Sequence, residues 1–260
     1  VRIRKNKEKI ILQKPGFQSE FSINNDLFEI LKLVDGHKSI IDITKELSVS
    51  EDKVREVFLS LEKDNIIYLN NFLSDSKSSV CEYNFSYPLD MIYFEPTKGC
   101  NFKCIHCYAS APKIKNISGE LNAQGLEELV KQIDEIGALE VCFTGGEPFF
   151  SNKTLEISKR FHDKGIKLGY ITNGSLITNN LATELEKLKP SFIRLSFHSN
   201  DRTKFNFITK TNKYNVVLKN LSSLMDQGII PAISCTLFKG LNNSYENISQ
   251  FLSFFKKRGF

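Results

Sequence analysis

The sequence predicts an α/β protein, a partial (β/α)6 barrel that follows a small α+β domain. From residue 90 onward, short apolar runs alternate with amphipathic stretches, which is typical of β/α units in a parallel sheet or barrel. Residues 1–70 instead combine short strand-like runs with three closely spaced helical patterns. The 260 residues, 41% hydrophobic and 25% charged, are ordinary for a soluble globular chain of one or two domains.

The first domain is predicted over residues 1–72, with the element order of a winged helix. Two strands, Ile3–Leu12 and Glu20–Ile23, flank Pro15-Gly16 as in a hairpin. Three helices and a short strand follow, and residues with capping side chains precede each helical pattern. We expect the helices after Asn24 (ending at Gly36), near Ser39 and after Ser50, and the strand at Ile66–Leu69.

Residues 73–89 are polar and aperiodic, and they predict a linker that includes Cys81 as an ordinary thiol. The second domain is predicted over residues 90–260. Five β/α units do not close a barrel comfortably, so we expect the chain to stop before a last unit. The predicted strands are Met91–Glu95, Leu139–Phe143, Ile166–Ile171, Phe192–Phe197 and Ile229–Leu237, and the helices lie at 121–136, 153–164, 177–188, 213–227 and 244–258.

Composition excludes several classes of protein. No run approaches 18 apolar residues and no apolar segment follows the basic N-terminus, which predicts no membrane span and no signal peptide. Thirty-five basic against 30 acidic residues select no partner. A cytoplasmic location is therefore expected. Three of the six cysteines fall within eight residues, a pattern that indicates metal ligation rather than a disulfide framework.

Polar segments follow four of the predicted strands. In barrels of this kind functional residues gather at the carboxyl ends of the strands. The cysteine group follows the first strand, and Thr144–Pro148 follows the second. Thr172-Asn173-Gly174 follows the third strand, and Ser196 and His198 end the fourth. All four segments are therefore expected to meet on one rim, which predicts an active site there.

The cysteines Cys100, Cys104 and Cys107 have x3 and x2 spacing on one short segment. Such a loop can bind three irons of a four-iron cluster, whereas an all-protein cluster takes four cysteines. The iron without a protein ligand can then bind a substrate or cofactor through an amine and a carboxylate. The alternative is structural zinc, but zinc sites usually pair two such groups, and His106 has little freedom to complete a tetrahedron.

The segment CNFKCIHCY, followed about 40 residues later by TGGEP within a β/α array, resembles the radical S-adenosylmethionine (SAM) enzymes. The resemblance covers roughly residues 90–260. It implies that Cys100, Cys104 and Cys107 hold a [4Fe–4S] cluster, whose open iron chelates the amine and carboxylate of SAM. Reductive cleavage of SAM would then give a 5′-deoxyadenosyl radical that abstracts hydrogen from the substrate.

The same resemblance implies roles for eight further residues. His106 holds the position that meets the adenine, and Tyr108 is expected to support the loop. Glycines allow close backbone approach, and a carboxylate suits an ammonium group. The residues expected to bind SAM are His106, Tyr108, Gly145, Gly146, Glu147, Thr172, Asn173 and Ser196.

Some residues near the rim carry weaker expectations. Related maturases often have Ser-x-Asp-Gly where this chain has Ser196-Phe197-His198-Ser199, so no catalytic role is assigned to His198. A hydrogen-bonded rim histidine is the simpler interpretation. Lys210 matches only weakly an arginine that meets the SAM carboxylate. Cys142 and Cys235 lie in apolar strands, which favours buried structural thiols.

A winged helix raises the possibility of DNA binding, but the third helix opposes it. Phosphate contacts supply most nonspecific affinity for DNA, and acidic residues repel phosphate. Residues 1–72 resemble instead the small winged-helix elements that bind leader peptides of ribosomally made natural products, such as the pyrroloquinoline-quinone peptide chaperone. The predicted third helix carries Glu51, Asp52, Glu56, Glu62 and Asp64 against Lys53, Arg55 and Lys63.

These observations together predict a radical SAM enzyme that modifies a precursor peptide, forming a thioether or carbon–carbon crosslink. The leader would bind residues 1–72 and raise the effective concentration of the peptide at the barrel mouth. The partners expected are this peptide and a flavodoxin- or ferredoxin-like electron donor, and auxiliary clusters are expected outside these residues. The alternatives are radical modification of a small-molecule cofactor precursor, and an iron–sulfur or zinc regulator that binds DNA through residues 24–65.

Overall fold

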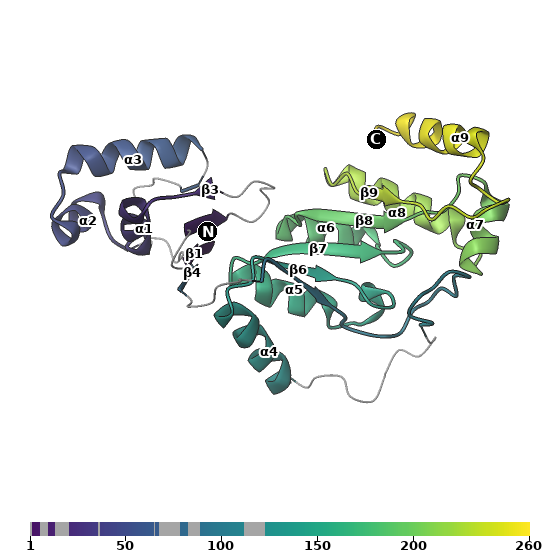
Figure 1. Cartoon of the computed structure of the whole chain (residues 1–260), viewed down its shortest axis with the longest axis horizontal. Coiled ribbons are helices and arrows are strands. Elements are labelled where there is room, and N and C mark those ends of the chain that lie inside the picture. Colours follow the sequence, from purple (N-terminus) through teal and green to yellow (C-terminus); the bar gives the residue numbers. More distant parts are fainter. Residues whose placement is uncertain are drawn as a thin grey trace.

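The chain forms two modules, an N-terminal module (residues 2–82) and a barrel module (residues 89–260), shown in Figure 1. Each module has its own sheet and its own apolar core. No helix in the described part of the chain is long and apolar enough to cross a membrane. The computed structural model describes residues 2–5, 10–13, 21–35, 37–64, 66–67, 79–82, 89–111 and 123–260.

The N-terminal module is a four-stranded sheet in the order β3-β2-β1-β4. Strand β1 is antiparallel to β2 and parallel to β4, and β2 is antiparallel to β3. Apolar side chains from the strands and helices form one core that includes Ile3, Leu12, Phe28, Ile43 and Phe58. The elements are β1 (Arg2–Lys5), β2 (Ile10–Gln13), β3 (Phe21–Ser22), α1 (Asn25–Lys32), α2 (Ile40–Leu47), α3 (Glu51–Lys63) and β4 (Ser79–Glu82).

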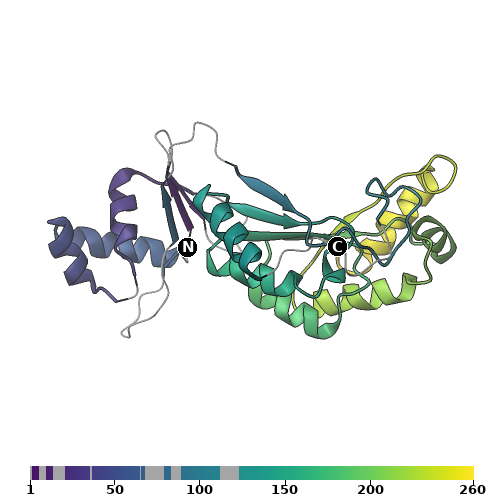
Figure 2. The same ribbon diagram turned by 90° about the horizontal axis from the view of Figure 1, so that it is seen from below.

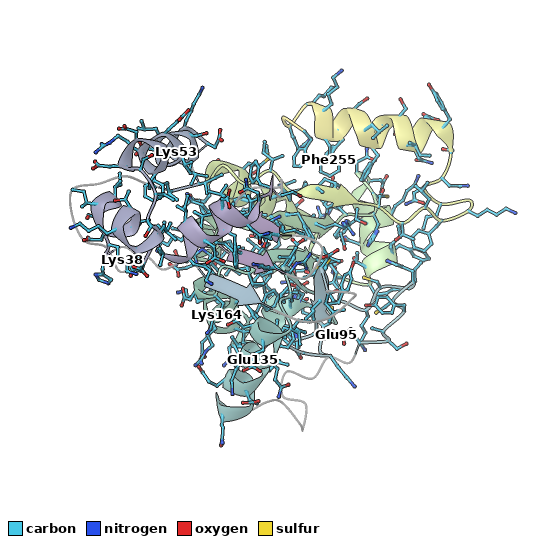
Figure 3. All side chains as sticks on the ribbon, turned by 60° about the vertical axis from the view of Figure 1, so that its left-hand side comes forward. Lys38, Lys53, Glu95, Glu135, Lys164 and Phe255 are labelled. Atoms are coloured by element: carbon cyan, nitrogen blue, oxygen red, sulfur yellow. The ribbon has the colours of Figure 1, made fainter. Side chains whose placement is uncertain are left out.

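The three helices begin where the capping residues predict. The side chain of Asn24 accepts the amide N–H of Leu27 at 2.9 Å, and Ser39 forms a reciprocal capping box with Asp42. Ser50 precedes α3 without a side-chain cap. The helices present charged side chains to solvent, and Figure 3 shows Lys38 and Lys53 on this surface.

The strands of this module differ from the prediction. The expected strand Ile3–Leu12 is two strands, because pairing of β1 with β2 places Ile3 and Leu12 opposite each other on the core face. The expected linker contains β4, which pairs with β1 and adds a strand beyond residue 72. Ile66 and Ile67 are buried but lie outside any strand. The Pro15-Gly16 turn, Gly36 and residues 68–69 lie outside the described residues.

The barrel module confirms the predicted α/β class. Its five strands form one parallel sheet in the order β5-β6-β7-β8-β9, and helices lie along one face of it (Figure 2). The strands are β5 (Met91–Phe94), β6 (Glu140–Phe143), β7 (Lys167–Thr172), β8 (Phe192–Ser196) and β9 (Ala232–Ser234). The helices are α4 (Ala123–Glu135), α5 (Thr154–Asp163), α6 (Asn179–Leu188), α7 (Arg202–Thr209), α8 (Tyr214–Asp226) and α9 (Tyr245–Lys256).

Helix α7 is a feature that the sequence analysis missed. Its N-terminus is capped by Asp201, whose carboxylate accepts the amide N–H of Lys204 at 2.9 Å. Its apolar face buries Ile208 and also Phe205, whose ring contacts Phe197 within a second core that is rich in aromatic residues and includes Cys100. Helix α7 therefore lies beside β8 at the end of the sheet where the predicted rim residues gather.

The N-terminal sheet contacts the opposite end of the barrel. Arg4 of β1, which is 3% exposed, donates to the Asp90 carboxylate at 2.6 Å and to the Leu89 carbonyl at 3.3 Å. The side chain of Gln13 is fully buried, and the amide orientation that satisfies both of its polar atoms has it donating to the Leu139 carbonyl at 2.8 Å and accepting from the Lys167 ammonium at 3.0 Å. These barrel residues precede or begin β5, β6 and β7, so the N-terminal module lies at the amino ends of the strands.

Candidate functional site at the carboxyl rim of the barrel

The three clustered cysteines lie on a loop directly after β5, which we call the cysteine loop (residues 97–108). The loop is held by the end of α7: the amide N–H groups of Lys103 and Ile105 donate to the carbonyls of Thr209 and Ile208 at 3.2 and 2.9 Å. These two carbonyls belong to the last turn of the helix and would otherwise lack partners. Helix α7 therefore positions the cysteine loop.

The thiols of the loop are in a low-polarity environment. Cys100 is 9% exposed and packs within the aromatic core, while Cys104 and Cys107 are half-buried. Desolvation by burial raises the pKa of Cys100, and it raises the pKa of Cys104 to about 12. Such thiols become thiolates when bound to a metal.

The cysteine loop contains a contact that suits metal ligation. Within the described ranges, no three His, Cys, Asp or Glu side chains are grouped to hold one metal ion. A four-iron cluster carries its ligands at separate corners, so its cysteines need not converge on one point. The sulfur of Cys100 also accepts the amide N–H of Phe102 at 3.3 Å, a bond that suits a thiolate ligand.

The segment Thr144–Pro148 after β6, which we call the glycine segment, lies against the backbone of the cysteine loop. Gly146 and Glu147 donate their amide N–H groups to the carbonyls of Thr97 and Gly99 at 3.2 and 2.9 Å. A Cβ added at Gly146 would lie 2.1 Å from the Gly99 oxygen, and Gly145 has a φ of +102°. The glycines are therefore required for the contact between these two loops.

The Glu147 side chain is fully buried and joins two strand ends. Its carboxylate accepts hydrogen bonds from the Thr172 hydroxyl and from the backbone N–H of Asn173, both at 2.7 Å, and from the backbone N–H of Phe149 at 3.3 Å. Burial raises its pKa to about 7, although the hydrogen bonds act in the opposite direction. The predicted residues Glu147, Thr172 and Asn173 are thus brought together, with the carboxylate already engaged by protein donors.

Two histidines meet at the rim. The rings of His106 and His198 lie edge to face with centroids 4.5 Å apart, and the ring of Phe238 is 5.2 Å from that of His106. The Nδ1 atom of His106 is buried and has no hydrogen-bond partner among the described residues. An orphaned polar atom of this kind is consistent with a bound molecule that supplies the missing partner.

His198 is 4% exposed and is fixed by hydrogen bonds. Its Nδ1 accepts the amide N–H of Thr236 at 3.1 Å, so Nδ1 carries no proton and the neutral ring is protonated at Nε2. Burial, and secondarily the nearby His106, lower the pKa of His198 to about 4. This arrangement agrees with the interpretation of His198 as a hydrogen-bonded rim histidine.

The remaining expected residues are placed less centrally. Ser196 is half-buried at the end of β8, and Tyr108 is 84% exposed beside the last cysteine. The ammonium of Lys210 lies 4.3 Å from the ring centroid of Phe207, where α7 ends, and this contact gives no support to the weak arginine match. Cys142 is buried in β6 as predicted.

Cys235 differs from the prediction. It is half-buried just beyond the short strand β9, and its thiol donates to the His198 carbonyl at 3.4 Å. The predicted strand Ile229–Leu237 is shortened because Asn242 folds back onto this segment and donates to the carbonyls of His198 and Thr236 at 2.7 and 2.9 Å.

Asn101 and Ser175 are site residues that the sequence analysis missed. Asn101 lies between two of the cysteines, where its spacing carries no signal of its own, and its amide donates to the Ser175 hydroxyl at 2.7 Å. Asn220 of α8 donates to the Gly174 carbonyl at 2.8 Å and supports the same loop from outside. Only the tertiary structure brings these amides together.

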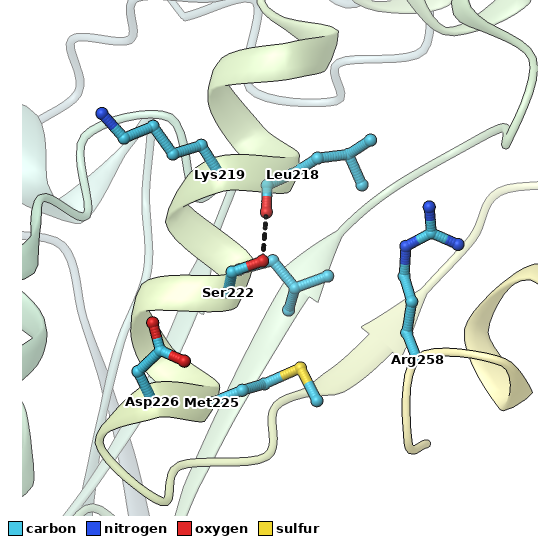
Figure 4. A pocket seen from close by; sticks show the side chains of 7 residues that line it. Leu218, Lys219, Ser222, Met225, Asp226 and Arg258 are labelled. Carbon is cyan, nitrogen blue, oxygen red and sulfur yellow. Dashed lines mark hydrogen bonds between the residues drawn. The ribbon is translucent and has the colours of Figure 1, made fainter.

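Two cavities lie near these elements. A cavity of about 300 Å³ at the rim is lined by the segment that follows β8, by β9 and the segment after it, and by α9, including His198, Cys235 and Phe251. A cavity of about 390 Å³ lies on the outer surface between α8 and Arg258 (Figure 4), where Ser222 hydrogen-bonds within its own helix. The rim cavity is lined by His198, whereas the outer cavity is lined by no predicted site residue.

Comparison with solved structures supports the fold. The structure of Streptococcus suis SuiB bound to the precursor peptide SuiA has a TM-score of 0.63 and 20% sequence identity, and covers 97% of this chain and 58% of that one. The structure titled "Native anSMEcpe with bound AdoMet" has a TM-score of 0.55 and 21% identity, and covers 66% of this chain and 50% of that one. At these identities the likeness concerns the fold alone.

Curated relatives match about six-tenths of the chain. Fe-coproporphyrin III synthase of Methanosarcina barkeri is 27% identical over 57% of this chain and 37% of its own length. A protein described as "Probable GTP 3',8-cyclase" of Thermococcus kodakarensis is 29% identical over 61% of this chain and 51% of its own length. The chain therefore spans about a third to a half of the length of these relatives.

A family model supplies the assignment. The model described as "Radical SAM superfamily" matches residues 94–252, which include the cysteine loop, the glycine segment and the strand ends at the rim. The predicted enzyme class is thereby confirmed, and the family uses a [4Fe–4S] cluster and SAM. On this match, which covers more than half of its residues, the chain belongs to the radical SAM superfamily.

Proposed function

We propose that this chain catalyses a radical modification of a ribosomally made precursor peptide, most simply a thioether or carbon–carbon crosslink. The observation that carries the proposal is the extent of the structural likeness. The SuiB structure with its precursor peptide aligns with 97% of this chain and therefore with both modules, whereas the curated small-molecule enzymes match 57–61% of it. Binding of a leader peptide would give the N-terminal module a role in the reaction.

Within the proposal, Cys100, Cys104 and Cys107 hold the cluster. Bound there, the cluster and SAM supply one-electron chemistry that ends in abstraction of a hydrogen atom from the substrate. Phe102 and Phe205, whose rings meet edge to face at 6.5 Å, keep water from the Cys100 side of the site. His106 offers an unpaired, buried Nδ1 to the bound cofactor, in the position where the family places adenine.

The glycine segment holds the site together in this proposal. Gly146 and Glu147 fix the glycine segment to the cysteine loop through backbone hydrogen bonds. The carboxylate of Glu147 joins the ends of β6 and β7 through Thr172 and Asn173. Thr172, Asn173 and Ser196 are then held at the rim with SAM, where the substrate would enter.

The leader would bind at the open edge of the N-terminal sheet. Strand β3 is one of the two edge strands of the described sheet, the other being β4, and the amide N–H of Ile23 donates inward to the Ile10 carbonyl at 3.1 Å. Because neighbouring N–H groups along a strand point in opposite directions, the N–H of Ser22 faces the open edge. An added peptide strand could accept that hydrogen bond.

The position of the N-terminal module sets a requirement on the peptide. The module contacts the amino ends of β5–β7, whereas the cysteine loop follows the carboxyl end of β5. Strand β7 has six residues and spans roughly 20 Å at about 3.3 Å per residue. The leader and the modified residue must therefore be separated by at least about six extended residues.

The test uses anaerobically reconstituted, full-length enzyme, SAM, a reductant and a peptide encoded beside the gene. We expect peptide-dependent release of 5′-deoxyadenosine and a peptide lighter by two hydrogens in mass spectrometry. One hydrogen would leave as an atom in 5′-deoxyadenosine, and the other as a proton whose electron would be accepted by an iron–sulfur cluster of the enzyme. Release of 5′-deoxyadenosine that never depends on a peptide would overturn the proposal.

The leader site has a matched pair of variants. Ser22→Pro removes the outward N–H, which an edge strand tolerates, whereas Ser22→Ala keeps it. We expect Ser22→Pro to weaken leader binding about fivefold, the loss of one hydrogen bond of about 1 kcal/mol, and Ser22→Ala to leave it unchanged. Equal affinity of the two variants would exclude this edge as the leader site.

The second candidate is modification of a small-molecule cofactor precursor. The curated relatives favour it, because an Fe-coproporphyrin III synthase and a probable GTP 3',8-cyclase match 57–61% of this chain. Under this alternative, GTP or a porphyrin would stimulate 5′-deoxyadenosine release and the Ser22 variants would have no effect. The same assay, run with each substrate class, separates the two functions.

A further inference from the structure

A closed circuit of hydrogen bonds fixes the side chain of Asn173 beside Cys100. The Asn173 amide donates to the Asn101 oxygen at 2.9 Å, and Asn101 donates to the Ser175 hydroxyl at 2.7 Å. The backbone N–H of Ser175 donates to the side-chain oxygen of Asn173 at 2.9 Å and closes the circuit. Because a backbone N–H can only donate, this last bond identifies the Asn173 oxygen and so determines which way the amide faces.

The second hydrogen of that amide is directed at a cysteine sulfur. The Nδ2 atom of Asn173 lies 3.8 Å from the Sγ of Cys100, within hydrogen-bonding range for sulfur. The Asn173 side chain is 9% exposed, so water does not compete strongly for this donor. Cys100 thus accepts two N–H groups, from Asn173 and from the backbone of Phe102 at 3.3 Å.

The buried carboxylate of Glu147 holds Asn173 from behind. It accepts the Asn173 backbone N–H at 2.7 Å, and the Thr172 hydroxyl, which it also binds, accepts the N–H of Gly174 at 3.0 Å. Backbone and side chain of Asn173 are therefore both fixed. The geometry places a rigid donor, rather than a mobile one, next to the sulfur.

We infer that Asn173 donates an N–H···S hydrogen bond to the Cys100 thiolate and thereby raises the reduction potential of the cluster. The inference rests on the proposed ligation by Cys100 and not on the peptide substrate. Reduction adds one electron to the cluster, from the 2+ to the 1+ state of its core, and breaks no bond. The extra negative charge spreads to the sulfurs, so a hydrogen bond to sulfur stabilises the reduced state more than the oxidised state.

The hydrogen bond from Asn173 would make the one-electron reduction of the cluster more favourable. A low-potential one-electron donor, such as a reduced flavodoxin or ferredoxin, must supply that electron. Asn173 is then a positioning and tuning residue, and Glu147 supports it. The expected contribution is about a tenfold change in the ratio of reduced to oxidised cluster at a fixed potential, which for one electron equals about 59 mV.

The test is a redox titration of the cluster in the absence of substrate, in which electron paramagnetic resonance (EPR) measures the reduced fraction at each potential. Asn173→Leu and Asn173→Asp both remove the N–H donor, and Asn173→Asp keeps the oxygen that accepts from Ser175. We expect both to lower the reduction potential. Ser175→Ala is the matched control, because it breaks the circuit at Asn101 but leaves the Ser175 N–H, and hence the Asn173 amide, in place. We expect its potential to match that of the wild-type protein.

Potentials of both Asn173 variants equal to wild type would overturn the inference, as would an equal shift in Ser175→Ala. Should the Asn173 variants fail to bind iron, the wild-type protein labelled with ¹⁵N at the asparagine side-chain amide gives a second readout. We expect pulsed EPR of the reduced cluster to show hyperfine coupling to this nitrogen, and its absence overturns the inference. Retention of the cluster in Cys100→Ala would instead show that the proposed ligation is wrong.

Discussion

The rim of the barrel module and the surface of the N-terminal module use polar residues in different ways. At the rim, Glu147, Asn173 and His198 are each at least nine-tenths buried and bonded to groups on other segments of the chain. In the N-terminal module, Asn24, Ser39 and Asp42 are exposed and cap helices in their own neighbourhood. The rim is built by contacts between distant residues, and the helical surface by local ones.

The difference explains why the residue types at the rim indicate a function, whereas those of the N-terminal module do not. Binding a metal cluster requires thiolates at set positions, so the residue types themselves are diagnostic. A strand that pairs with a peptide uses backbone groups, which every sequence possesses. Substitutions should therefore be costly at the rim and mild in the N-terminal module.

The largest expected effect is loss of the cluster. Replacing Cys100, Cys104 or Cys107 by Ala should abolish iron binding and SAM cleavage, because each change removes one of the three proposed ligands. Cys142→Ala should retain both, since this thiol lies in β6 within the core and away from the rim. Iron content and 5′-deoxyadenosine release measure these outcomes. Normal cluster content in any of the three rim variants would remove that cysteine from the ligand set.

The next largest effect is expected where two loops touch. Gly146→Ala should destabilise the protein by about 3 kcal/mol, because its Cβ would meet the Gly99 backbone oxygen at 2.1 Å. Gly240→Ala is the matched control: nothing lies within 4 Å, and its φ of +75° should cost only about 1 kcal/mol. Anaerobic denaturant unfolding compares them. A smaller loss for Gly146→Ala than for Gly240→Ala would contradict the tight loop contact.

A pH-dependent effect should follow from His198. Its pKa of about 4 in the folded protein lies below the value of about 6.5 expected when unfolded, so the unfolded chain binds the proton more readily. Stability should therefore be unaffected above pH 6.5 and should fall as the pH drops from 6.5 to 4, by about 2–3 kcal/mol. His198→Gln should lack this slope in unfolding measurements. If the free energy of unfolding depends on pH in the same way in both proteins, burial does not keep His198 neutral.

The smallest effect is expected between the two modules. Arg4→Met keeps the buried stem but loses the hydrogen bond to Asp90, which should cost about 1 kcal/mol. Asp90→Asn keeps an acceptor oxygen at an exposed position and should cost less than about 0.5 kcal/mol. Hydrogen exchange in β1 and β4 reports the change. Faster exchange in Asp90→Asn than in Arg4→Met would show that the charge, rather than the donor, matters most.

The local pattern predicted most of the barrel module correctly. All five of its strands and five of its helices were expected from apolar periodicity, and the cysteine spacing placed them in the right family. Helix α7 was missed, because it is short and its buried face is apparent only beside Phe197. Strand β4 was missed for a similar reason: Ser79–Glu82 carry little strand signal and are held by pairing with β1.

The family of the chain and its cofactors could be predicted from residue types and spacing, because iron and SAM demand particular atoms at short intervals along the chain. The circuit of Asn101, Ser175 and Asn173, and the attachment of the N-terminal sheet to the amino ends of the strands, could not. These features join residues more than 70 positions apart, and such pairings are decided by packing of whole elements rather than by any local preference.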